Sequence, residues 1–165
     1  MALERLWAGW RAPYVTDAAG APVDGGDCLF CRLLAADPEE ALVLDRDGLT
    51  FAVLNVYPYN SGHLMVAPVR HEADLEGLSS EESVAVMTMT QRAVRALKAA
   101  YKPDGLNVGL NVGRPAGAGV PGHVHLHALP RWSGDTNFMT AVAEARVLPE
   151  DLQTSYDRLR AAWPR

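Results

Sequence analysis

Three histidines alternate with apolar residues between positions 122 and 130, in the order Gly-His-Val-His-Leu-His-Ala-Leu-Pro. Because a β-strand has a side-chain period of two, His123, His125 and His127 are predicted to share one face of a strand. Neighbours on such a face lie about 6.5–7 Å apart. These are three of the five histidines in the chain, and each ring needs partners for both nitrogens. The pattern therefore favours a functional face over a strand whose histidines merely face solvent.

Such a face is suited to two kinds of chemistry. Alternating histidines can bind a metal ion. Imidazole can also act as nucleophile, acid or orienting group, because it exchanges protons near neutral pH. A hydrolytic metal site usually adds a nearby carboxylate, whereas the next acidic residue along this chain is Asp135. That spacing favours a nucleophilic histidine and leaves a metal-dependent hydrolase as an alternative.

The bulk properties fit a single domain. The chain has 165 residues, of which 48% are hydrophobic and 21% charged, as in an ordinary globular protein. Its net charge of −5 argues against non-specific nucleic-acid binding, although a local positive site can still hold a nucleotide. No apolar run approaches a membrane span, and the N-terminus lacks a signal-peptide core. We expect a cytoplasmic protein with no membrane or nucleic-acid partner, an N-terminal arm over 1–27 and one domain over 28–165.

The hydrophobic pattern predicts an α+β layer fold. Ser79 and Glu82 form a capping-box signal for a long helix that Pro103 ends. Asp47-Gly48 indicates a hairpin turn. The predicted helices span about 28–36, 80–102 and 149–163, and the predicted strands span 41–44, 49–56, 62–68, 105–112 and the histidine segment, with a glycine-rich loop over 113–122.

Cys28 and Cys31 are the only cysteines. A Cys-x-x-Cys pair in a cytosolic protein is a redox pair, half of a zinc site or two free thiols. Two thiolates need two more ligands to close a tetrahedral zinc site, and His63, His71 or a spare triad histidine can supply them.

The alternating histidines resemble the signature of the histidine triad family. The segments 130–138, 54–66 and 6–14 are similar to the diadenosine tetraphosphate phosphorylase-like bacterial branch of that family. The resemblance covers nearly the whole chain. It implies a five-stranded antiparallel sheet with a long crossover helix. It also implies a homodimer in which the two sheets join edge to edge.

The resemblance also implies roles for the histidines. His125 is the nucleophile that attacks the α-phosphorus of a nucleotide, which splits one displacement into two easier ones. His127 contacts the phosphate and helps the leaving group depart, an effect typically worth about 10²–10⁴ in rate. His63 supports the triad through hydrogen bonds between neighbouring strands. The alternative for His125 and His63 is a buried, hydrogen-bonded histidine with no catalytic role.

Further matches to the family predict how a nucleotide is held. Asn55 corresponds to a ribose contact. Asn111, Gly117 and Gly119 correspond to phosphate contacts, although on glycine content alone the loop could be a hairpin connection. Relatives commonly carry Ser or Gln near positions 118 and 119, whereas this chain has Ala118 and Gly119, which leaves backbone N–H groups or Arg114 to bind phosphate. Trp132 is predicted near the polyphosphate, with simple packing as the alternative.

In zinc-bearing members of the family, the Cys-x-x-Cys pair joins two histidines. Here the corresponding ligands are Cys28, Cys31, His71 and His123. A Cys₂His₂ set leaves no position for a reacting water, so the zinc is expected to be structural. No organic cofactor is expected.

The expected function is cleavage of dinucleoside polyphosphates, such as diadenosine tetraphosphate, through a nucleotidyl-His125 intermediate. Phosphate as the acceptor makes a phosphorylase, and water makes a hydrolase. A nucleoside phosphoramidate or adenylate hydrolase is an alternative. So is a zinc-stabilised nucleotide-binding protein with little turnover.

Overall fold

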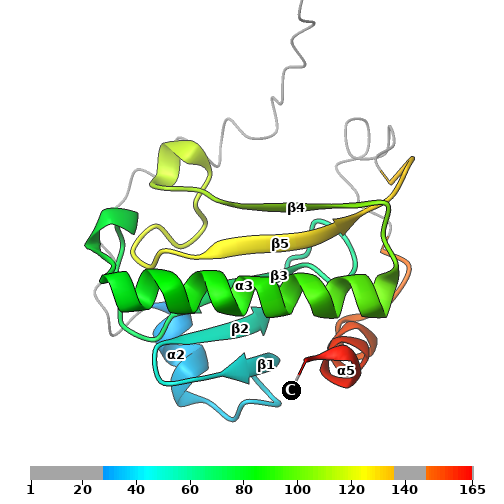
Figure 1. Ribbon diagram of the computed structural model, residues 1–165, viewed down its shortest axis with the longest axis horizontal. Helices are drawn as coiled ribbons and strands as arrows, with labels where there is room; N and C mark the ends of the chain where they lie inside the picture. The colour runs from blue at the N-terminus through cyan, green and yellow to red at the C-terminus, as the bar shows by residue number, and fades with distance from the viewer. Residues whose placement is uncertain (1–27, 136–147, 165) are drawn as a thin grey trace, which may run out of the picture.

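The structure is a computed structural model that describes residues 28–135 and 148–164 (Figure 1). The predicted N-terminal arm and the 136–138 end of the branch-like segment lie outside these residues. The elements run in the order α2 (Leu29–Ala35), β1 (Val43–Arg46), β2 (Thr50–Leu54), β3 (Leu64–Pro68), η2 (Leu75–Gly77), α3 (Ser80–Tyr101), β4 (Gly105–Leu110), η3 (Arg114–Ala116), β5 (Leu126–Arg131) and α5 (Leu152–Ala162).

The strands form one antiparallel sheet in the order β1-β2-β3-β5-β4. The turn between β1 and β2 is closed by Asp47, whose Oδ1 accepts hydrogen bonds from the backbone N–H groups of Leu49 and Thr50, both at 2.8 Å. Helix α3 connects β3 to β4 across one face of the sheet. The predicted α+β fold, with five antiparallel strands and a long crossover helix, is confirmed.

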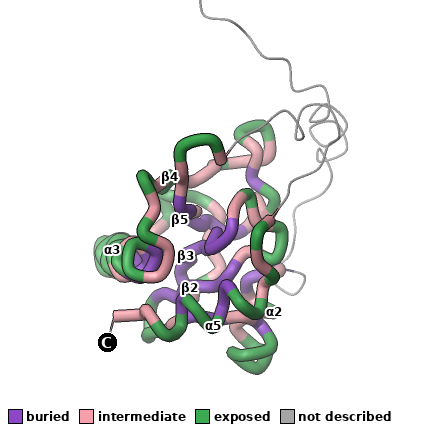
Figure 2. Tube along the Cα trace, turned by 90° about the vertical axis from the view of Figure 1, so that its right-hand side faces the viewer, coloured by how far each residue is buried: buried purple, intermediate pink, exposed green. Residues whose placement is uncertain are grey.

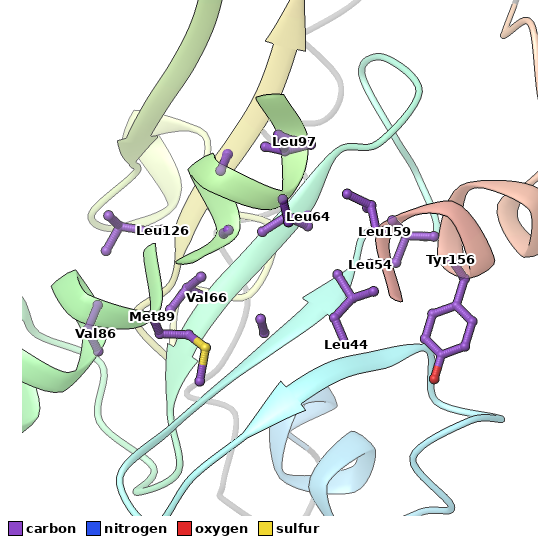
Figure 3. Close-up of a cluster of buried hydrophobic side chains, with 14 residues drawn as sticks. Leu44, Leu54, Leu64, Val66, Val86, Met89, Leu97, Leu126, Tyr156 and Leu159 are labelled. Atoms are coloured by element: carbon purple, nitrogen blue, oxygen red, sulfur yellow. The ribbon is translucent and has the colours of Figure 1, made fainter. Parts of the chain in front are cut away.

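The sheet carries a hydrophobic cluster on each face. Alternate residues of β3 point to opposite sides, so Leu64 and Val66 join one cluster and Met65 and Ala67 the other. Helices α3 and α5 cover the first face, and α2 lies on the opposite side (Figures 2 and 3). Helix α3 buries residues at helical spacing, namely Val86, Met89, Ala93, Ala96 and Leu97. None of the helices within 28–135 and 148–164 is long and apolar enough to cross a bilayer.

The histidine segment differs from its predicted form. Strand β5 begins at Leu126, so His123 and His125 lie in an irregular segment before it. Two hydrogen bonds account for this: the backbone N–H of Val124 donates to the distant carbonyl of Glu72 at 2.7 Å, and the carbonyl of His123 accepts from the His125 side chain at 2.7 Å. These groups are therefore not used in a strand ladder.

The predicted capping box is present at the start of α3. Ser79 Oγ accepts from the backbone N–H of Glu82 at 3.1 Å, and the Glu82 carboxylate accepts from the backbone N–H of Ser79 at 2.8 Å. Arg70 also donates to Glu82 at 2.8 Å. These donors, with Arg70 the largest contributor, lower the pKa of Glu82 to about 2.

We expect Glu82→Gln to destabilise the protein at pH 7 by about 1 kcal/mol, the scale of a partly exposed ion pair with a cap. A carboxyl group whose pKa is lowered by folding stabilises the protein above its unfolded pKa, near 4.3, and loses that effect as the pH falls toward 2. Urea unfolding of both proteins between pH 7 and pH 3 measures the difference. A difference that stays constant over that range would contradict the prediction.

Candidate active site and metal centre

His125 is buried, with 4% of its surface exposed, and its ring centroid lies 4.8 Å from that of Phe30 in α2. Its Nδ1 lies 2.7 Å from the carbonyl oxygen of His123. Because a carbonyl can only accept, Nδ1 carries the hydrogen and Nε2 carries the lone pair. Burial lowers the pKa of His125, which favours the neutral ring. His125 is therefore held in the tautomer that a nucleophile requires.

His63 and His127 form a second defined pair. His63 Nδ1 accepts from the backbone N–H of Tyr59 at 3.1 Å, so its hydrogen is on Nε2, which lies 2.9 Å from His127 Nδ1. His127 Nδ1 is thus an acceptor, and its own hydrogen is on Nε2. Burial, and then the neighbouring His125, lower the pKa of His127 to about 4. His127 is a neutral hydrogen-bond donor beside His125, with ring centroids 4.9 Å apart.

Asn55 lies against this pair. Its Oδ1 accepts from the backbone N–H of Tyr57 at 2.9 Å, and its Nδ2 lies 3.3 Å from His63 Nδ1. In the described structure Asn55 therefore helps to orient His63. Its ribose contact stays a prediction.

The glycine-rich loop is tightly turned before β5. Gly113 and Gly117 have φ angles of +77° and +95°, which favour glycine. Asn111 Nδ2 reaches the Gly117 carbonyl at 3.5 Å, and the backbone N–H of Ala118 bonds back to the Gly113 carbonyl at 3.3 Å. Gly119 is exposed. Asn111 thus braces the loop, and part of the backbone donor set is already used within it.

Trp132 lies on the other side of the sheet from the histidines. Its ring packs edge-on against Tyr101 of α3, with centroids 6.1 Å apart. His127 pairs with Met65, whose side chain belongs to the cluster on the α2 side. This placement supports the packing alternative for Trp132.

Four predicted metal ligands come together: Cys28, Cys31, His71 and His123. Their ligand atoms all lie within 4.8 Å of one another, and both cysteines are free thiols. His123 Nε2 donates to the Pro68 carbonyl at 2.9 Å, so its Nδ1 lone pair faces Cys28 Sγ at 3.4 Å. A main-chain carbonyl that accepts from the far ring nitrogen commonly orients a histidine ligand. The donor set fits a closed tetrahedral metal site.

The three histidines of the triad have two different sets of partners. His123 joins the cysteine cluster, whereas His125 and His127 make the hydrogen bonds described above. A site in which all three histidines bind one metal is therefore not what the side chains form.

Sequence reasoning missed three contributors to the site. Tyr59 donates its backbone N–H to His63 Nδ1, and the carbonyl of Asn60 accepts the backbone N–H of His63. Main-chain contacts of this kind do not depend on residue type, so the sequence does not reveal them. Phe30 packs against His123 and His125 with centroids 5.2 and 4.8 Å away. Its position between Cys28 and Cys31 is the sequence signal that could have predicted its place beside these histidines.

Comparison with known proteins identifies the family and agrees with the fold. The family model "HIT domain" matches residues 38–134. A protein of Mycobacterium tuberculosis named AP-4-A phosphorylase is 40% identical over 99% of this chain and 86% of its own length. A Zn-bound histidine triad family protein of Mycobacterium smegmatis is 31% identical, with a TM-score of 0.68 over 84% of this chain and 94% of that one.

A structure of a Hit-like protein from Bartonella henselae superimposes with a TM-score of 0.69 at 23% identity, over 86% of this chain and 99% of that one, and shows the shared fold. The five-stranded sheet with its crossover helix, and the adjacent imidazole rings of His63, His125 and His127, define the class of protein: an α+β protein whose site is built from histidines. The chain belongs to the histidine triad family, and the prediction of an enzyme of that family is confirmed at the family level.

Proposed function

We propose that the protein cleaves dinucleoside polyphosphates, such as diadenosine tetraphosphate, at the α-phosphate through a covalent nucleotidyl-His125. The observation that carries the proposal is the buried, neutral His125, with its hydrogen on Nδ1 and its lone pair on Nε2. The 40% identity to an AP-4-A phosphorylase over nearly the whole chain supports this class of substrate.

In the first step, His125 Nε2 forms a bond to the α-phosphorus while the bond to the bridging oxygen breaks. The electron pair of that bond leaves with the departing nucleoside polyphosphate. The ring becomes cationic, and its Nδ1–H remains directed at the His123 carbonyl, which stabilises the charge. His127 donates its Nε2–H to a phosphate or leaving oxygen. A polyphosphate leaves readily as an anion, so this donor need not transfer its proton.

In the second step, an acceptor oxygen forms a bond to the phosphorus, the N–P bond breaks, and its electron pair returns to Nε2 of His125. A phosphate dianion attacks through a deprotonated oxygen, whereas an attacking water releases a proton to the solvent. Inorganic phosphate as acceptor gives ADP and ATP from diadenosine tetraphosphate, whereas water gives AMP and ATP. Ala118 and Gly119 offer no polar side chain to a phosphate group. Arg114, in η3 of the same loop, is the cation we assign to phosphate binding there.

We further propose that zinc binds Cys28, Cys31, His71 and His123. The ion would supply structural crosslinking, because it would join α2, the segment after β3 and the segment before β5. Burial, and then the neighbouring Cys28, raise the pKa of Cys31, so binding a metal would displace protons from the thiols. All catalytic steps above are carried by the protein side chains.

The proposal also includes a cytoplasmic homodimer joined through β4. Strand β4 lies at one edge of the sheet, where unpaired backbone groups can extend pairing to a second copy. Val108 on this strand is 46% exposed, and Val84 on α3 is 67% exposed. These apolar groups are suited to burial against another chain.

We expect His125→Ala to lower turnover of diadenosine tetraphosphate by roughly 10³-fold or more, because the covalent route is lost. Chromatography of the products, with and without phosphate, measures this and identifies the acceptor. ADP that appears only with phosphate indicates phosphorolysis, and AMP in both samples indicates hydrolysis. Unchanged turnover by His125→Ala would exclude the nucleotidyl-His125 intermediate.

We expect purified protein to hold about one zinc ion per chain and to melt at a lower temperature after chelation, since structural zinc contributes folding energy. Elemental analysis and circular dichroism measure both effects. His71→Ala should lose zinc, and Glu76→Ala, an exposed nearby change, should keep it. Chelation that abolishes activity while the fold and melting temperature stay unchanged would instead indicate a catalytic metal.

A further inference from the structure

We propose that Asp135 is a positioning residue for the leaving-group side of the site. Through Asn60 it holds the loop between β2 and β3, so that His63 keeps His127 aligned. The inference rests on the proposed function for its catalytic consequence. The hydrogen-bond geometry that carries it is independent of any substrate.

Asp135 is a hub of hydrogen bonds at the end of β5. Its side chain is only 8% exposed. Two of its bonds come from Arg131, at 2.6 and 2.7 Å, and one comes from the backbone N–H of Trp132 at 3.1 Å. These close the local turn. A fourth comes from Asn60 Nδ2 at 2.9 Å, across 75 positions of sequence. That bond joins the turn to a different part of the chain.

Asn60 connects the Asp135 carboxylate to His63 through its own hydrogen bonds. The Asn60 side chain also donates to the Pro130 carbonyl at 3.3 Å, so it is held to β5 at two points. Its own carbonyl accepts the backbone N–H of His63 at 3.1 Å. The preceding residue, Tyr59, donates its N–H to His63 Nδ1, and its ring packs at a tilt against His63 with centroids 4.7 Å apart.

The result is a continuous series of bonds from Asp135 to His127. It passes from the carboxylate to Asn60, from Asn60 to the His63 main chain, and from His63 Nε2 to His127 Nδ1 at 2.9 Å. If the loop shifts, His127 Nδ1 loses its donor. The His127 hydrogen can then move to Nδ1, which removes the Nε2–H donor from the leaving group. Geometry at Asp135 thereby sets the hydrogen position on a ring that touches substrate.

The test compares three variants of the full chain with the wild type. Asn60→Ala breaks the connection and leaves the bonds between Asp135 and Arg131 intact. Asp135→Ala removes the hub, and the double variant tests whether the two act as one unit. The control is Asp104→Asn. Asp104 accepts from the backbone N–H of Ser133 in the same turn at 2.7 Å, and the bond lies on the β4 side, away from the β2–β3 loop.

We expect Asn60→Ala to lower kcat for diadenosine tetraphosphate by about 10-fold with KM changed less than about 2-fold, the scale of one lost hydrogen bond. The double variant should lose little more than the worse single variant. In Asn60→Ala, the imidazole ¹⁵N chemical shifts should show His127 as a mixture of tautomers in place of the Nε2–H form. Asp104→Asn should keep wild-type kcat and tautomers.

Wild-type kcat and unchanged His127 tautomers in Asn60→Ala would overturn the inference, and so would an equal loss in Asp104→Asn. If Asp135→Ala fails to fold, Asn60→Ala still decides the question. A wild-type protein that does not cleave the dinucleotide contradicts the proposed function. The tautomer measurement then still tests the link from Asp135 to His127.

Discussion

The antiparallel pairing of β3 with β5 is the constraint on which both parts of the site depend. The register sets Met65 opposite His127 and Val66 opposite Leu126. This brings His63, just before β3, beside His127, and it brings the far end of β3 beside His123, which bonds to the Pro68 carbonyl. A shift of one residue would turn His127 toward α3 and separate both pairs. The hydrophobic clusters on the two faces oppose that shift, because it would remove apolar side chains from one cluster and place histidine rings among the apolar side chains of the other.

His123 joins the cluster of Cys28, Cys31 and His71 to the proposed reaction site within a single residue. Its side chain faces the cysteines, and its carbonyl accepts the Nδ1–H of His125. Any rearrangement of the cluster therefore moves the carbonyl that sets the tautomer of His125. The irregular backbone before β5 serves this purpose, since a regular strand would commit the same carbonyl to a neighbouring strand.

Burial and hydrogen-bond direction act together on the rings of His125 and His127. Burial lowers the pKa of both His125 and His127, and each ring has one nitrogen committed to a defined partner. The remaining nitrogens then have opposite characters: His125 offers a lone pair and His127 offers a hydrogen. The proposed displacement at phosphorus uses both, the lone pair for attack and the hydrogen for the departing oxygen. The loop from Asn55 to Gly62 contributes by orienting His63, which keeps the hydrogen of His127 on Nε2.

The sequence by itself determined the α+β fold and the cap of α3, because periodicity and caps are local signals. Its resemblance to the histidine triad family added the five-stranded sheet and the four residues that cluster at the proposed metal site. The sequence did not predict that β5 starts only at Leu126, that Trp132 packs on Tyr101, or that Asn60 joins Asp135. These features depend on long-range contacts and on main-chain hydrogen bonds, which no residue type reveals. Only the tertiary structure decided which nitrogen of each histidine holds a hydrogen, since that follows from the partner on the opposite atom.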